Sequence, residues 1–107
     1  MALPVEVSQK ADQDVMGHYL SMDAANPVAA DRFVAAVRAT YEQLSVHPQL
    51  GRDRGMELPG EGVVRTWGVK GFRNYLIVYS ASMKRVYVIR VLDGRRDIPA
   101  ILQSDLE

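Results

Sequence analysis

The sequence predicts an α+β fold in which a helical hairpin packs on a small, mostly antiparallel sheet. Apolar residues recur at helical spacing through most of the first half of the chain. Runs rich in valine, isoleucine and tyrosine fill much of the second half, as is typical of strands. The connections between these segments are short, which favours antiparallel neighbours. The expected order is β-α-α-β-β-β, in a single domain over residues 1–107, because this length suffices for one modest core.

A short strand and a first helix are expected at the N-terminus. Leu3 to Val7 alternates in polarity, and Pro4 suits a sheet edge because proline cannot donate to a ladder. Ser8 is a suitable N-cap, and apolar residues then recur at helical spacing, so a helix is expected from about Gln9 to Ser21. Its apolar stripe is narrow, and His18 within it is expected at the surface.

The second helix is bounded by prolines. Asn26 is a good N-cap, and Pro27 suits the first helical position, where its missing N–H costs nothing. The helix is expected to end near Val46, because Pro48 disfavours the α conformation in the residue before it. The connection from Met22 to Asn26 is short, so the two helices should form an antiparallel hairpin.

The second half is expected to supply most of the sheet. Arg52 to Gly62 is rich in glycine and charge and is predicted to be a surface loop. Three strands should follow it, at Val63 to Val69, Tyr75 to Tyr79, and Val86 to Leu92. Ile98 to Leu102 is expected to form about one helical turn, within a C-terminal tail, residues 98–107, that is a short helix or frayed.

Several chemistries have little support in the sequence. The chain has no cysteine, so it offers neither a disulfide framework nor a thiolate. Its two histidines and scattered acids show no metal-ligand spacing, and no serine lies in a nucleophile-elbow context. We therefore expect no metal, no cofactor and no nucleophilic catalysis. No signal peptide and no apolar run of about 20 residues is evident, which favours a cytoplasmic protein without a membrane partner.

Charge is divided unevenly along a chain whose formal net charge is zero. Residues 1–51 carry 3 cations and 6 anions, whereas residues 63–96 carry 8 cations and 1 anion. Ten of the 13 cations are arginine, which suits bidentate capture of carboxylates or phosphates. The basic half is therefore a candidate surface for an anionic partner. The alternative is that these cations only keep the sheet edges soluble.

The candidate binding residues are arginines and aromatic side chains of this basic half. Arg65 and Arg90 should project from the sheet, and Arg95 and Arg96 from its end. Most aromatic side chains are expected in the core, with Tyr79 at a strand end as the best exception. For Arg90, in an apolar run, a structural ion pair is the alternative to a binding role. The full candidate set is Arg65, Trp67, Arg73, Tyr79, Arg90, Arg95 and Arg96.

Several short motifs follow one another over nearly the whole chain. They are Asn26-Pro27-x-x-Ala30-x-x-Phe33, His47-Pro48-x-x-Gly51-Arg52, Val64-Arg65, Tyr75-Leu76-Ile77-Val78-Tyr79, and Val88-Ile89-Arg90-Val91-Leu92-Asp93-Gly94-Arg95-Arg96-Asp97. In order and spacing they resemble the RelE/ParE toxin superfamily, in its ParE branch. The resemblance implies a helical hairpin on an antiparallel sheet and a toxin of a type II toxin–antitoxin module.

The resemblance also implies a partner. The cognate antitoxin is commonly a ribbon-helix-helix, ParD-like DNA-binding protein whose C-terminal segment wraps the toxin, so contact with DNA would be indirect. An apolar groove beside the helical hairpin and a strand edge would accept an amphipathic helix and an added strand. The basic sheet would face the acidic groups of the antitoxin.

Within the superfamily, ParE-like members are understood to inhibit DNA gyrase, and RelE-like members cleave mRNA at the ribosome. RelE-type cleavage uses a tyrosine or histidine near the C-terminus, and Ile98 to Gln103 contains neither. Arginine neutralises a phosphate but is a poor proton donor or acceptor. A gyrase-binding toxin without catalytic residues is therefore favoured, with an mRNA endoribonuclease or a non-toxic basic binding module as alternatives. One departure is Asp93, where ParE members often have histidine.

Overall fold

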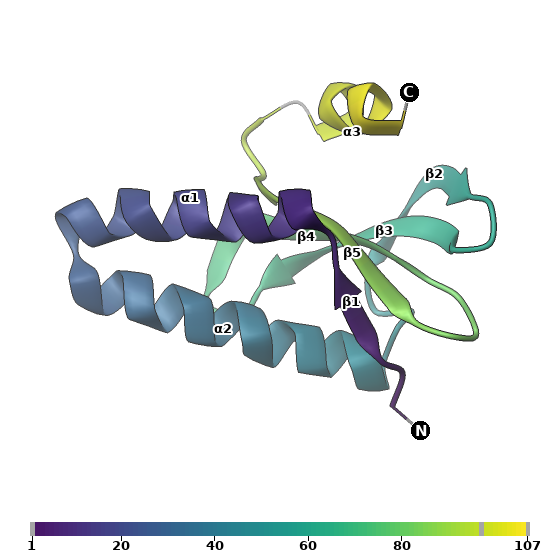
Figure 1. The fold of residues 1–107 in the computed structure, drawn as a ribbon, viewed down its shortest axis with the longest axis horizontal. Coiled ribbons are helices and arrows are strands. Elements are labelled where there is room, and N and C mark those ends of the chain that lie inside the picture. The colour runs from purple at the N-terminus through teal and green to yellow at the C-terminus, as the bar shows by residue number, and fades with distance from the viewer. Residues whose placement is uncertain (1, 97, 107) are drawn as a thin grey trace.

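A five-stranded sheet with helices on both faces forms the molecule in a computed structural model that describes residues 2–96 and 98–106 (Figure 1). The elements in chain order are β1 (Val5–Val7), α1 (Gln9–Ala25), α2 (Pro27–Val46), β2 (Arg52–Leu58), β3 (Gly62–Val69), β4 (Phe72–Ala81), β5 (Val86–Asp93) and α3 (Ile98–Leu106). The predicted α+β class, with a helical hairpin on the sheet, is confirmed. Asp97 and Glu107, which belong to the expected motif and tail, lie outside the described residues.

The sheet has the strand order β1-β5-β4-β3-β2. β1 runs parallel to β5, with Val5 opposite Val86, and the other neighbouring strands are antiparallel. β1 therefore lies at one edge, as Pro4 suggested, and β2 lies at the other. The mostly antiparallel sheet expected from the sequence is confirmed.

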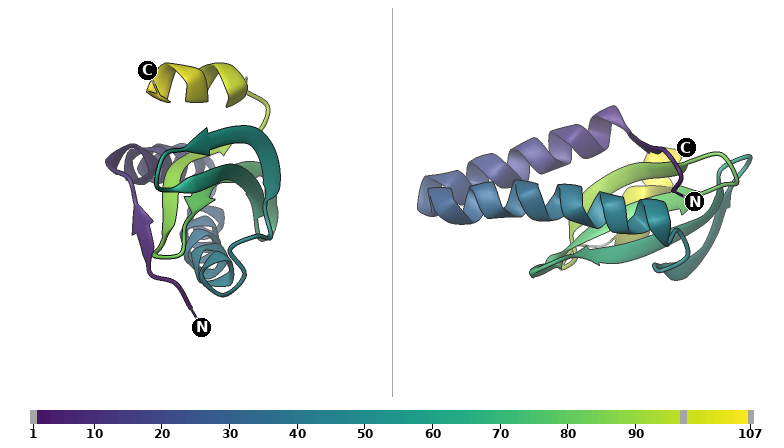
Figure 2. Two further views of the ribbon diagram at one scale, coloured as in Figure 1. Left: turned by 90° about the vertical axis from the view of Figure 1, so that its right-hand side faces the viewer. Right: turned by 90° about the horizontal axis from the view of Figure 1, so that it is seen from below.

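The α1–α2 hairpin covers one face of the sheet and α3 the other, as the end-on view in Figure 2 shows. Under the hairpin, Phe33 is fully buried, and its ring makes edge contacts with Phe72 at 5.4 Å and Tyr75 at 5.0 Å between centroids. Under α3, Ile98 and Leu102 pack against apolar side chains of β3, β4 and β5. The inner strands are apolar on both faces because both faces are covered.

The hairpin connection is a single residue. Asn26 ends α1, where its main-chain N–H donates to Met22 O, and begins α2, where its side chain accepts from Ala29 N. The expected end of the first helix at Ser21 was wrong by about one turn, because the double cap lets α1 continue to Ala25.

Two further expectations were wrong. Most of the segment predicted to be a surface loop is strand β2. In this strand Arg54, Met56 and Leu58 are partly buried and alternate with exposed residues. Its pairing with β3 is irregular around Gly55, whose φ is 75°. A strand at an edge needs only one partner and tolerates glycine and charge, which hid it from the sequence pattern. The expected single turn after Asp97 is the longer helix α3. No helix in residues 2–96 and 98–106 is long and apolar enough to cross a membrane.

Candidate functional site

Arg90 is held in a largely buried ion pair with Asp14 of α1. Its Nε lies 2.7 Å from Asp14 Oδ2 and its Nη2 lies 2.9 Å from Oδ1. The side chains of Arg90 and Asp14 are only 16% and 14% exposed. The main-chain N of Val91 donates to the same carboxylate at 3.0 Å. Of the two roles considered for Arg90, the structure places it in the ion pair that fastens α1 to β5.

His18 is a second polar link between α1 and β5. Its Nε2 donates to the carbonyl oxygen of Val91 at 2.8 Å, and its ring lies against Tyr75 at 4.8 Å between centroids. The expectation of an exposed His18 is therefore wrong. β1 pairs with β5 only up to Val88. Beyond that residue, polar side chains of α1 form hydrogen bonds with main-chain groups at the edge of β5.

Tyr79 is fully buried, which overturns the expectation that it escapes the core. Its hydroxyl accepts from Gly51 N at 2.8 Å and donates to Pro48 O at 2.9 Å. Burial raises the pKa of this phenol, so it stays protonated and keeps both bonds. Arg65 is partly buried and donates from Nη1 to Gly51 O at 2.9 Å. Both side chains therefore hold the connection between α2 and β2 in place through hydrogen bonds to its main chain.

Asp93 organises the two arginines that end the sheet. Its carboxylate accepts from the Arg95 guanidinium at 2.7 and 3.0 Å and from the Arg95 main-chain N at 3.0 Å. These hydrogen bonds lower the pKa of Asp93 to about 2. The Arg95 side chain is nevertheless 76% exposed, and Arg96 is exposed beside it. The departure from the family pattern at Asp93 therefore has a structural effect, which is to hold Arg95 at the end of β5.

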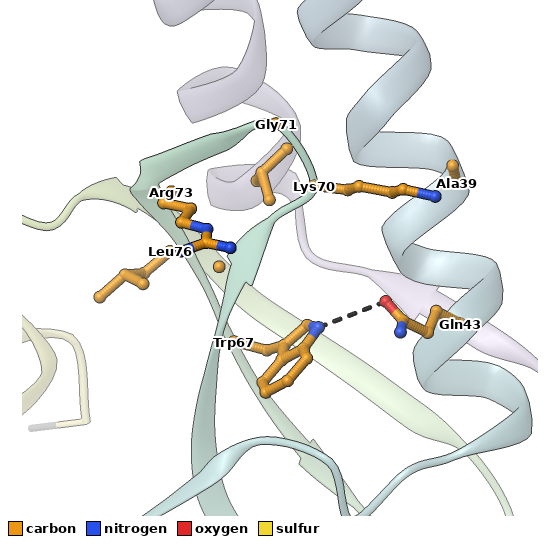
Figure 3. A pocket seen from close by; sticks show the side chains of 9 residues that line it. Ala39, Gln43, Trp67, Lys70, Gly71, Arg73 and Leu76 are labelled. Atoms are coloured by element: carbon orange, nitrogen blue, oxygen red, sulfur yellow. Dashed lines mark hydrogen bonds between the residues drawn. The ribbon is translucent and has the colours of Figure 1, made fainter.

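An open groove of about 720 Å³ lies where α2 faces the end of β3 (Figure 3). In this groove the Trp67 indole donates from Nε1 to Gln43 Oε1 at 3.3 Å, and the Lys70 side chain extends toward Ala39 of α2. The residues that line the groove are Ala39, Gln43, Trp67, Gly68, Val69, Lys70, Gly71, Arg73 and Leu76.

Two cations of this groove are available for an external anion. Lys70 and Arg73 are exposed, and neither has a carboxylate within ion-pair distance among the residues that the structure describes. By contrast, Arg85 is paired with Glu6 and Glu61. Two free cations beside an indole and aliphatic groups suit a ligand that is anionic and partly apolar.

The structure thus divides the predicted site residues into three groups. Trp67 and Arg73 lie together in the groove. Arg95 and Arg96 follow β5 at the same end of the sheet, where Tyr75 pairs with Asp93. The remaining three, Arg65, Tyr79 and Arg90, make contacts that hold the fold. Lys70 and Gln43 were missed as groove residues, although the Lys70-Gly71 turn signal marked the strand end.

A second groove of about 460 Å³ lies between the two long helices. Its lining mixes aliphatic and aromatic groups with single charges, from Asp12, Val15, Met16, Tyr19, Val34, Val37, Arg38 and Tyr41. Met16, on the α1 side of this groove, is 57% exposed. The groove expected at the hairpin is therefore present, and its occupant remains a prediction.

Comparison with known proteins agrees with this geometry. The family model described as ParE toxin of type II toxin-antitoxin system, parDE, matches residues 5–98. Toxin ParE3 of Caulobacter vibrioides is 35% identical over 66 residues, which are 62% of this chain and 60% of that relative's length. A solved chain of the chromosomal ParDE TA system from P. aeruginosa superposes with a TM-score of 0.66 at 20% identity, covering 84% of this chain and 94% of that one, and supports the fold. Because the family match takes in the helical hairpin and the whole sheet, this chain belongs to the family of ParE toxins of type II toxin–antitoxin systems.

Proposed function

We propose that this chain is the toxin of a type II toxin–antitoxin system, and that it acts in the cytoplasm by binding and inhibiting DNA gyrase. The observation that carries the proposal is the ParE toxin family match along residues 5–98. The likeness to Toxin ParE3 over 66 residues supports the same assignment.

The kind of groups gathered at the surface supports inhibition by occupancy rather than by cutting RNA. Lys70 and Arg73 lie beside an indole, an amide and aliphatic side chains in the groove. Such groups contribute contact area and charge complementarity to a bound partner. Arg95 and Arg96 add exposed positive charge at the same end of the sheet. This surface is suited to an acidic patch on a partner protein.

We propose further that a cognate ParD-like antitoxin, with its DNA-binding part outside the contact, neutralises the toxin. The groove between α1 and α2 fits one side of an amphipathic helix, since it combines exposed Met16 with Val15 and Val34. The exposed cations at the sheet end would attract acidic antitoxin residues and accelerate association.

Induced expression of the chain tests this function in cells. Growth should stop, and co-expression of the antitoxin gene that neighbours the toxin gene should restore it. With purified components, the toxin should reduce ATP-dependent supercoiling by gyrase, and primer extension on translated mRNA should show no new cuts. Unchanged supercoiling at excess folded toxin would refute the gyrase assignment, and toxin-dependent mRNA cuts would favour the endoribonuclease.

The electrostatic part of antitoxin binding has its own test. The exposed cations are the appropriate positions, because Arg90 is tied to Asp14 and its replacement would damage the fold. Arg73→Glu and Arg96→Glu should weaken antitoxin binding and flatten its salt dependence, relative to Lys84→Glu at the β4–β5 turn. Equal affinities for all variants would show that these cations do not contribute to antitoxin binding and would contradict the electrostatic part of the proposal.

A further inference from the structure

We propose that the groove between α2 and the end of β3 binds a nucleoside di- or triphosphate. The nucleobase would stack on the Trp67 indole, and the phosphates would lie between Lys70 and Arg73. The inference goes beyond inhibition of a protein target and does not depend on it, because the groove is lined entirely by residues of this chain.

Contacts within the protein hold the walls of this groove in place. Thr40 of α2 is buried, and its hydroxyl accepts from the main-chain N of Lys70 at 3.2 Å while it donates to Ala36 O at 2.7 Å. One turn further along α2, Gln43 Oε1 accepts from the Trp67 indole at 3.3 Å. These two links join α2 to the end of β3 and to the turn after it, so the fold itself forms the groove.

Lys70 and Arg73 supply two positive charges that the fold does not neutralise. Both side chains are exposed, and neither makes an ion pair within residues 2–96 and 98–106. The described residues that line the groove include no aspartate or glutamate. Figure 3 shows both cations beyond the Trp67 indole, toward the β3–β4 turn. Two cations at one end of a groove match a diphosphate better than a single carboxylate.

The indole and the amide at the other end suit a nucleobase. Trp67 is only partly buried, and its ring lines the groove, where it offers a stacking surface to a planar ligand. Gln43 uses its oxygen for the indole N–H, so its amide nitrogen is left to donate to a ring nitrogen or carbonyl of the base. The groove therefore has a stacking end and a cationic end, and a nucleotide joins the two matching chemistries.

Size and composition separate this ligand class from simpler ones. The volume of about 720 Å³ lies within the range of roughly 300–1,000 Å³ that is usual for small-molecule sites. An inorganic anion would satisfy the cations but leave the indole without a contact. An uncharged aromatic ligand would stack but leave both cations unpaired. A nucleoside polyphosphate satisfies both ends.

Intrinsic fluorescence offers a direct test, because Trp67 is the only tryptophan of the chain. The probe is ADP, titrated into the full chain without divalent cations and with excitation at a wavelength where adenine does not absorb. Indole emission should be quenched saturably. Calorimetry should show that adenosine and pyrophosphate each bind about 10-fold more weakly than ADP or less, because each meets only one end of the groove.

Removal of the two charges should weaken ADP binding. Lys70→Gln/Arg73→Gln should raise the Kd for ADP about 10-fold, measured by calorimetry. Both positions are exposed, so the fold should be retained. Lys84→Gln, an exposed cation at the β4–β5 turn, is the matched control and should leave the Kd unchanged.

A second pair of variants separates a site in the groove from general charge attraction. Ala39 and Ala35 are both exposed on α2, but only Ala39 lines the groove, where the Lys70 side chain extends toward it (Figure 3). Ala39→Glu would give Lys70 a carboxylate partner and should raise the Kd about 5-fold or more. Ala35→Glu changes the net charge equally and should change the Kd less than about twofold.

Four results would overturn the inference. They are the absence of saturable quenching in a folded protein, pyrophosphate binding as tight as that of ADP, equal effects of the two glutamate variants, and displacement of ADP by polyglutamate at equal charge concentration. Gyrase does not enter these measurements. Their failure would therefore leave the proposed function intact, and a failed supercoiling assay would leave the nucleotide site intact.

Discussion

Single polar side chains fasten distant segments of this protein where the main chain has no partner of its own. Tyr79 holds Pro48 and Gly51, which lie about 30 positions earlier, and Asp14 of α1 accepts from the main-chain N of Val91 in β5. The sequence indicated Tyr79 as a strand residue but not what covers it, because that contact depends on how the chain returns after α2. Trp67 and Arg73 were predicted as binding residues from type and region, and both line the groove.

Removal of the Tyr79 hydroxyl should destabilise the fold. Tyr79→Phe keeps the ring but leaves the buried N–H of Gly51 and the carbonyl of Pro48 without this partner. The expected loss is about 1–3 kcal/mol in the free energy of unfolding, measured by urea denaturation. Tyr87→Phe is the matched control, since that hydroxyl makes no hydrogen bond within the described residues. Equal stability of the two variants would contradict the role given to Tyr79.

Asp93 should contribute a pH-dependent part of the stability. Its pKa is about 2 in the folded chain, below the ordinary value of 3.8, so the unfolded chain binds more protons between these values. The stability that Asp93 contributes is therefore present above about pH 4 and is lost as the pH falls toward 2. Urea midpoints of the wild type and Asp93→Asn should converge over this range. A gap that stays constant over this range would contradict the role given to Asp93.

Among the helices and strands, the sequence predicted the bounds best where the local residue pattern and the burial of the element in the fold agree. α2 has Asn26 and Pro27 at its start and a buried stripe throughout, and its predicted ends are those observed. The strands β3, β4 and β5 form the covered part of the sheet and were placed within a few residues. β2 could not be predicted from its pattern, because an edge strand is defined by its neighbour rather than by its own side chains.

The docking of α1 should depend on one ion pair. Asp14 binds both the Arg90 guanidinium and the Val91 N–H, with little exposure of either side chain. Asp14→Asn removes the carboxylate that binds both groups at this largely buried position, so it should cost about 2–4 kcal/mol in the free energy of unfolding. Asp12→Asn, an exposed position on the same helix, should cost much less. Similar losses for the two variants would show that the pair is not needed.

For the whole molecule, the uneven charge along the sequence becomes a small exposed basic surface. Arg85, Arg90 and Arg95 are each neutralised by a carboxylate. Lys70 and Arg73 are left at the groove and Arg96 at the end of β5. The excess of cations in the sequence therefore overstates the exposed basic surface, since several of these cations form ion pairs within the fold.

This surface should be required for inhibition but not for folding. Lys70→Gln/Arg73→Gln should raise the toxin concentration for half-maximal inhibition of supercoiling about 10-fold, because two favourable charge contacts are lost. The urea midpoint should change little, since both side chains are exposed. Lys84→Gln serves as the control, and an unchanged inhibition curve for the double variant would show that the target binds elsewhere.

The most direct measurement is a supercoiling titration in which gyrase is held fixed, well above the dissociation constant, and the toxin is increased. Inhibition by binding predicts that activity falls in proportion to toxin added, reaches its plateau near the stoichiometry of the complex, and returns when antitoxin is added in excess. Full supercoiling at a large excess of folded toxin, or inhibition that deepens with time at toxin far below the gyrase concentration, would contradict the account.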